Sequence, residues 1–190
     1  MTSPLAELFG DLKAVFEITK SRWYLFGAQA AIIHGAARLT ADVDITVILG
    51  DSTVKSLVDA LNRTGFELRI SNATEFAAQT KILSVAHLKS GIPVDIVLGG
   101  QGLEEQFAFR ARQCEFYGVE VPVACKEDII AMKILSGREK DLGDTLAIIS
   151  AQIEQLDIQQ IQSTLGTLEG ILDRSDLRPL LENLLRQVQR

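Results

Sequence analysis

The chain has 190 residues, 47% of them hydrophobic, which suits one globular domain with a buried core. Its 25 acidic and 19 basic residues give a formal net charge of -6, which argues against a general electrostatic grip on nucleic acid phosphates. The two cysteines have no CxxC spacing and indicate neither a disulfide scaffold nor a zinc site. No apolar run reaches membrane-spanning length and the N-terminus lacks a signal-peptide pattern, so we expect a cytoplasmic protein.

Helix and strand patterns alternate through the first two thirds of the chain. Apolar side chains at helical spacing follow a Thr-Ser-Pro start, and short β-rich runs are bounded by glycine-containing turns. The predicted elements, in chain order, are helix 3–19, strand 23–26, helix 28–37, strand 43–49, a turn and cap at 50–52, a helix from residue 54, strands 66–70, 81–88 and 93–98, helix 103–111 and an extended segment at 114–123.

The pattern becomes helical from residue 126 onward. The sequence therefore predicts an α+β fold in which a mixed β-sheet is flanked by helices and followed by a helical C-terminal part. We expect the boundary near residue 123. This divides the chain into an α/β core, residues 1–123, and a helical part, residues 124–190, packed on the core.

Carboxylates interrupt two of the predicted strands. Asp42 and Asp44 share the side of their strand that faces away from the apolar set, and Asp95 lies between apolar neighbours in a later strand. If the two strands pair, three carboxylates converge, and like charges side by side destabilise a sheet unless a cation lies between them. Mg2+ favours such oxygen ligands, so we predict all three as metal ligands. The alternative is a solvated strand end with Arg38 or lysines as counter-ions.

A strand, a glycine and the start of a helix, "YLFGAQAA", precede the acidic strand and are suited to presenting backbone N–H groups to a phosphate. Phe26-Gly27-Ala28, then Asp42-Val43-Asp44-Ile45, then Asp95 follow the signature of the nucleotidyltransferases related to polymerase beta, which this sequence resembles. The segments "FGAQAAIIHGAARLTADVDI" and "KEDIIAMKILSGREKDLGD" are most similar to the AbiEii-type branch, which includes toxins of toxin–antitoxin systems. The resemblance covers residues 23–149.

The resemblance implies a nucleotidyltransferase fold and a reaction that moves a nucleoside monophosphate from an NTP to an acceptor hydroxyl, with two Mg2+ ions. Asp42, Asp44 and Asp95 would be the metal-binding and catalytic carboxylates, with Asp95 assisting deprotonation. Lys133 would contact the nucleotide phosphate and Asp141 would orient a base or nucleophile. The remaining candidates for nucleotide binding are Gly27, Ala28, Arg38, Thr40, Arg138 and Lys140.

The basic and acidic residues of the second segment also have a purely structural interpretation. Lys133 lies in the apolar segment "IIAMKIL" and is compatible with a partly buried lysine that extends its ammonium to solvent. The charged residues that follow it are also typical of i,i+3 pairs at a helix end; they are Arg138, Lys140, Asp141 and Asp144.

Three acceptor or partner classes follow. The toxin branch implies tRNA as acceptor and an antitoxin protein as partner. The net negative charge favours a small-molecule acceptor, as in the aminoglycoside-modifying members of the wider superfamily. Ala28 stands where the family has Gly or Ser, and with the leucine-rich C-terminus it leaves a third interpretation, a catalytically degenerate protein-binding module. We expect no membrane partner.

Overall fold

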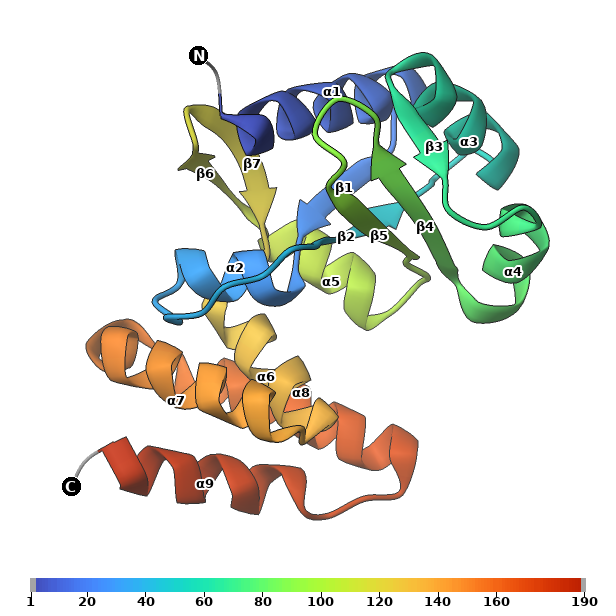
Figure 1. Ribbon diagram of the computed structural model, residues 1–190. Coiled ribbons are helices and arrows are strands. Elements are labelled where there is room, and N and C mark those ends of the chain that lie inside the picture. Colours follow the sequence, from blue (N-terminus) through green and yellow to red (C-terminus); the bar gives the residue numbers. More distant parts are fainter. Residues whose placement is uncertain (1–2, 189–190) are drawn as a thin grey trace. The chain divides into compact units, whose positions relative to one another are not determined.

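The computed structural model describes residues 3–188 (Figure 1). The strands are β1 (Arg22–Leu25), β2 (Val43–Ile48), β3 (Phe66–Leu68), β4 (Ile82–His87), β5 (Pro93–Leu98), β6 (Arg112–Phe116) and β7 (Val119–Val123). The helices are α1 (Pro4–Thr19), α2 (Gly27–Ile33), α3 (Val54–Arg63), α4 (Ala73–Thr80), α5 (Leu103–Arg110), α6 (Lys126–Ser136), α7 (Glu139–Gln152), the 3-10 helix η1 (Ile153–Gln155), α8 (Ile158–Leu172) and α9 (Leu177–Val188). None of the described helices is long and apolar enough to cross a membrane.

The strands form one mixed sheet in the order β3-β4-β5-β2-β1-β7-β6. Two pairs of strands are parallel, β2 with β5 and β1 with β7, and the other pairs are antiparallel. The predicted mixed α+β architecture is therefore confirmed. The order also makes the two aspartate-bearing strands, β2 and β5, direct neighbours.

The contacts within the chain divide it into two compact units. Unit 1 comprises the residues up to Gln29 together with Thr40–Ala124, and unit 2 comprises Ala30–Leu39 together with the residues from Cys125 onward. The division between Gln29 and Ala30 falls inside α2. Unit 1 thus contains the whole sheet, and unit 2 contains the helices from α6 to α9.

The core of unit 1 lies on the face of the sheet opposite to the acids. Val43, Ile45 and Val47 of β2 are fully buried, whereas Asp44 points to the other side because strand side chains alternate. Helix α1 packs against α3 and β7 (Figure 1). The apolar stripe of α3 buries Leu57. Helix α5 packs against β1 and β2.

Unit 2 is a helical assembly in which α6 contacts α7, α8 and α9, and α9 also contacts α7 and α8. Its buried apolar side chains include Ile129 and Ile134 of α6 and Leu165 of α8. A glycine in the left-handed conformation, Gly137, ends α6 and allows the sharp turn into α7.

Local details differ from the predicted elements. The helix predicted to end near residue 37 stops at Ile33, and the N-cap of α3 is Thr53 rather than a residue in the 50–52 turn. The Thr53 hydroxyl accepts a hydrogen bond from the Ser56 amide while the Ser56 hydroxyl accepts one from the Thr53 amide, a reciprocal pair that Ser52 does not make. The sequence interpretation also missed α4, a helix of eight residues.

Candidate functional site

A polar row crosses three neighbouring strands on the face of the sheet opposite to the core. Asp44 of β2 is the Cα partner of Asp95 of β5, and Asp95 is the Cα partner of Ser84 of β4. Facing residues of adjacent strands lie about 5 Å apart, with their side chains on the same face. We call Ser84, Asp95 and Asp44 the acidic row. All three are half-buried, because they lie at the surface of the sheet rather than in its core.

Gly27 leaves the space in which the Asp44 carboxylate lies. A Cβ built on Gly27 would be 2.6 Å from Asp44 Cγ, closer than real Cβ atoms approach a neighbour, and Gly27 has a positive φ of 61°. The Phe26 amide donates to the Asp44 carbonyl at 2.9 Å, which fixes the end of β1 beside β2. The strand–glycine–helix junction predicted from the sequence therefore lies directly against the acidic row, and only glycine fits there.

Asp42 lies just before β2, two residues from Asp44. Its carboxylate accepts a short hydrogen bond from the Thr40 hydroxyl, and Asp42 is half-buried. Among the residues that the structure describes, no three His, Cys, Asp or Glu side chains lie close enough together to share a metal ion. The structure therefore pairs Asp44 with Asp95 and places Asp42 at the edge of that pair.

The acidic row has the chemistry that Mg2+ requires. This ion is commonly bound by one or two carboxylates together with waters and substrate phosphates, so a complete cage of protein ligands is unnecessary. Asp44 and Asp95 supply two carboxylates on adjacent strands, and Gly27 gives the first of them room beside the backbone. The residues present therefore fit a hard divalent cation.

A second group of aspartates lies in unit 2, around a buried lysine. The Lys133 ammonium of α6 donates to Asp141 Oδ1 at 3.0 Å and to Asp144 Oδ2 at 2.6 Å, both on α7. Arg38 donates to Asp144 Oδ2 at 2.8 Å, and Arg138 donates to Asp141 Oδ2 at 2.5 Å. We call these five residues the Lys133 cluster. The side chains of the lysine and both aspartates are between 4% and 8% exposed, so the charges are neutralised by one another rather than by water.

The surroundings of Asp141 favour its ionised form. Burial raises the pKa of this carboxyl, but hydrogen bonds from Ser136, Arg138 and Lys133 outweigh burial and lower the pKa to about 2. Ser136 contributes a hydroxyl donor 2.7 Å from Asp141 Oδ2. Asp141 is therefore ionised at neutral pH.

This arrangement bears on the predicted roles of the basic residues. Lys133 is buried between two carboxylates rather than extended to solvent, and Arg138 and Asp141 form the i,i+3 pair that the sequence left as an alternative. Lys140 is exposed, as a contact to a phosphate would require. The nucleotide contacts of Lys133, Arg38, Arg138 and Lys140 and the catalytic role of Asp141 remain predictions, as do those of Gly27, Ala28 and Thr40.

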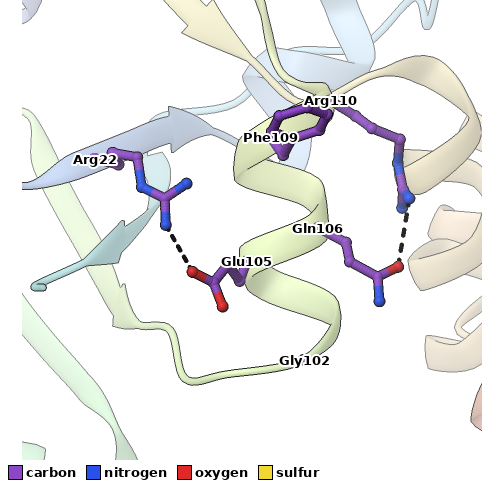
Figure 2. Close-up of a pocket in the computed structure, with 6 residues that line it drawn as sticks. All are labelled: Arg22, Gly102, Glu105, Gln106, Phe109 and Arg110. Atoms are coloured by element: carbon purple, nitrogen blue, oxygen red, sulfur yellow. Dashed lines mark hydrogen bonds and ion pairs between the residues drawn. The ribbon is translucent and has the colours of Figure 1, made fainter.

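A cavity of about 460 Å3 opens on α5, away from the acidic row (Figure 2). Arg22, Glu105 and Phe109 are among its lining residues, and Figure 2 shows the ion pair between Arg22 and Glu105, 2.8 Å long. Arg22 faces Ile48 in the register of β1 and β2, which puts it four residues, about 13 Å, along β2 from Asp44. This cavity therefore does not contain the predicted carboxylates.

Sequence reasoning missed Ser84 and missed the partners of Asp144, which it had named only as a helix-end charge. Ser84 donates a hydrogen bond to Asp95 Oδ1 at 2.6 Å, and Asp144 joins Arg38 to Lys133. Alternation between buried Leu83 and Val85 could have placed Ser84 on the polar face, but only the register shows that it faces Asp95. The pairing of Asp144 with Arg38 joins residues 106 positions apart and has no sequence signal.

Comparison with known proteins identifies the family. Residues 3–181 match the family described as "Nucleotidyltransferase of unknown function (DUF6036)". The chain belongs to this family. The family description identifies its members as nucleotidyltransferases, which agrees with the superfamily that the sequence motifs indicated. The AbiEii-type branch within that superfamily is not part of this match. No curated protein matches the sequence.

Solved structures show that this DUF6036 protein has the nucleotidyltransferase fold. The solution structure of the antibiotic-resistance factor ANT(2'')-Ia aligns with a TM-score of 0.62 at 11% identity, covering 91% of this chain and 95% of that one. The lincomycin-bound lincosamide antibiotic adenylyltransferase LnuA aligns with a TM-score of 0.52 at 16% identity, covering 79% and 98%. An antigenic nucleotidyltransferase-like protein from Paracoccidioides brasiliensis aligns with a TM-score of 0.57 at 19% identity, covering 98% and 94%.

Proposed function

We propose that this protein is a Mg2+-dependent nucleotidyltransferase that transfers a nucleoside monophosphate from an NTP to a hydroxyl of a small molecule. The observation that carries the proposal is the facing pair Asp44 and Asp95, with Gly27 leaving room for the Asp44 carboxylate. Two carboxylates on adjacent strands are expensive to keep together without a cation, which makes a purely structural role a poor explanation for them.

In the proposed reaction the acceptor oxygen forms a bond to the α-phosphorus of the NTP while the bond from that phosphorus to the bridging oxygen breaks. Pyrophosphate leaves, and Asp95 accepts the hydroxyl proton, directly or through a water. Asp44 and Asp95 would hold Mg2+, which supplies charge stabilisation at the phosphoryl oxygens, and Asp42, at the edge of this pair, would contribute to the second ion. Gly27 keeps Asp44 in place beside the end of β1, and Thr40 orients Asp42 through its hydroxyl.

The net charge of the protein and its structural similarity to antibiotic-modifying enzymes favour a small-molecule acceptor over tRNA. The net charge of -6 repels a polyanionic acceptor, does not repel a neutral one and attracts a cationic one. Two of the similar structures are complexes with small molecules, ANT(2'')-Ia with adenylyl-2''-tobramycin and the adenylyltransferase LnuA with lincomycin. The tRNA acceptor and antitoxin partner implied by the AbiEii-type resemblance have no comparable support. Ala28 is buried at the start of α2, and its lack of a hydroxyl does not disturb the acidic row.

The Lys133 cluster has a supporting role in this proposal. Because Lys133 is engaged by two carboxylates, we propose that it positions α6 against α7 and that the exposed Lys140 is the better candidate for a direct phosphate contact. A buried lysine that is held on two sides would have to leave both carboxylates to reach a nucleotide, which is costly.

The experiment that tests the proposal is nucleotidyl transfer with each of four α-labelled NTPs in Mg2+. Tobramycin, lincomycin and total tRNA are offered separately as acceptors. We expect label on a small molecule with one NTP, and a fall of more than about 100-fold in Asp44→Asn. Asp59→Asn, an exposed carboxylate on α3, is the matched control and should retain activity. Full activity in Asp44→Asn would refute the assignment, and label on tRNA alone would refute the acceptor class.

A further inference from the structure

Ser84 faces the acidic row from an element that no motif of the sequence marked. It lies in β4, whose inward residues Leu83 and Val85 are fully buried, while Ser84 shares the outward face with two apolar residues, Ile82 and Ala86. Its hydroxyl donates to Asp95 Oδ1 at 2.6 Å. A single polar side chain on this face thus contacts the last carboxylate of the row.

A hydrogen bond of this kind restrains a carboxylate strongly. The terminal torsion of an aspartate is broad and roughly two-fold, so an isolated carboxylate samples many orientations. A hydroxyl bonded to an ionised oxygen at 2.5–2.7 Å is a charge-assisted bond of about twice the ordinary strength. It fixes the torsion and occupies Oδ1, which leaves Oδ2 of Asp95 for other ligands.

Each carboxylate of the site is restrained by a different neighbour. The Thr40 hydroxyl restrains Asp42, the Gly27 backbone borders Asp44, and the Ser84 hydroxyl restrains Asp95. Groups that hydrogen-bond metal-binding side chains typically change metal affinity or activity about 10- to 100-fold when removed.

We propose that Ser84 is a positioning residue that sets the orientation of Asp95 for binding Mg2+. This inference rests on the proposed function, because it takes Asp95 as a metal ligand. Ser84 itself touches no reacting atom in this scheme. Ser84 acts on the cation only through Asp95, so Mg2+ binding should depend on the Ser84 hydroxyl and not on the rest of its side chain.

The test measures Mn2+ binding to the full chain by the electron paramagnetic resonance signal of the free ion, without any acceptor or NTP. We expect Ser84→Ala to weaken Mn2+ binding about tenfold, and Ser84→Thr, which keeps the hydroxyl and suits a strand, to restore it. Ser90→Ala is the matched control, because it removes a hydroxyl from the turn after the same strand, where Ser90 contacts His87. Thermal unfolding of each variant checks that the fold is retained.

In the transfer assay, Ser84→Ala should raise the Mg2+ concentration for half-maximal rate while leaving the KM for NTP unchanged. A merely structural serine would lower Tm without this separation. Unchanged Mn2+ affinity in Ser84→Ala, beside a loss of binding in Asp44→Asn, would overturn the role of Ser84 alone. Absence of Mn2+ binding by the wild type would overturn both this inference and the proposed metal site.

Discussion

Asp42 and Asp95 of the predicted site in unit 1 and the aspartates of the Lys133 cluster in unit 2 receive their hydrogen bonds from different sets of donors. Asp42 and Asp95 accept from the neutral hydroxyls of Thr40 and Ser84. Asp141 and Asp144 accept from an ammonium and two guanidinium groups, in addition to the Ser136 hydroxyl on Asp141, and their side chains are more than nine-tenths buried. Hydroxyls orient a carboxylate without cancelling its charge, whereas cations cancel it.

In our proposal this difference separates a metal-binding site from a structural ion-pair cluster. A carboxylate that is oriented but not neutralised keeps its attraction for a divalent cation. A carboxylate that is neutralised inside a helical assembly contributes mainly by fixing which helices pack together. Residue type alone does not distinguish the two, since both groups consist of aspartates near polar partners. Four substitutions or conditions test the comparison.

The largest effect is expected from Lys133→Met. The change leaves Asp141 and Asp144 buried with the arginines as their remaining cationic partners, so the free energy of unfolding should fall by about 3 kcal/mol. Urea unfolding followed by circular dichroism measures it. Lys140→Met removes an exposed lysine from the same region and should change stability by less than about 0.5 kcal/mol. Equal effects of the two changes would mean that the Lys133 cluster contributes nothing to stability.

Gly27→Ala should cost about 2 kcal/mol or more and should also displace Asp44. The new Cβ would collide with the Asp44 carboxylate and would sit at a φ of 61°. Gly50→Ala is the matched control, because Gly50 has a φ of 60° and no atom within 4 Å of a built Cβ. The difference between the two variants isolates the contact with Asp44. If both lose the same stability and both retain Mn2+ binding, Gly27 does not shape the site.

Acidification should weaken unit 2 through Asp141. Its pKa is about 2 in the folded protein against 3.8 for a free carboxyl, so its stabilisation is complete above about pH 4 and is lost as the pH falls toward about 2. The pKa difference corresponds to about 2 kcal/mol. Urea unfolding of wild type and Asp141→Asn should show a stability difference that shrinks by roughly half between neutral pH and about pH 3. A constant stability difference between the two proteins across this range would contradict the assignment.

The smallest effect, and one of opposite sign, is expected from Asp95→Asn in buffer containing EDTA. Removing one of two facing like charges should stabilise the metal-free protein by about 0.5 kcal/mol and raise Tm by about 1–2 °C. The amide oxygen can still accept from Ser84, so no buried donor is left unsatisfied. Asp59→Asn provides the baseline for removing an exposed charge. A lower Tm in Asp95→Asn would mean that the row is held together by its own contacts and is structural.

The sequence by itself determined the strands and helices of the sheet region and the residue types of the site. Alternation in "VDITVI" separates Asp44 from the buried set because successive strand residues point to opposite faces, and this holds before any partner strand is known. The order of glycine, Asp-x-Asp and later aspartate was sufficient to indicate the superfamily. The sequence did not predict the end of α2 or the existence of the short helix α4. A helix of two turns depends on its tertiary contacts more than on local propensity.

Only the tertiary structure decided which of these residues meet. The parallel pairing of β2 with β5 brings Asp44 beside Asp95, and the antiparallel pairing of β4 with β5 adds Ser84, because register is a property of two strands together. In the same way the sequence presented Lys133 as a cation suited to a phosphate, and packing of α6 against α7 placed it between two carboxylates. The sequence shows the charge of a side chain, but only the packing of the helices determines which opposite charges lie beside it.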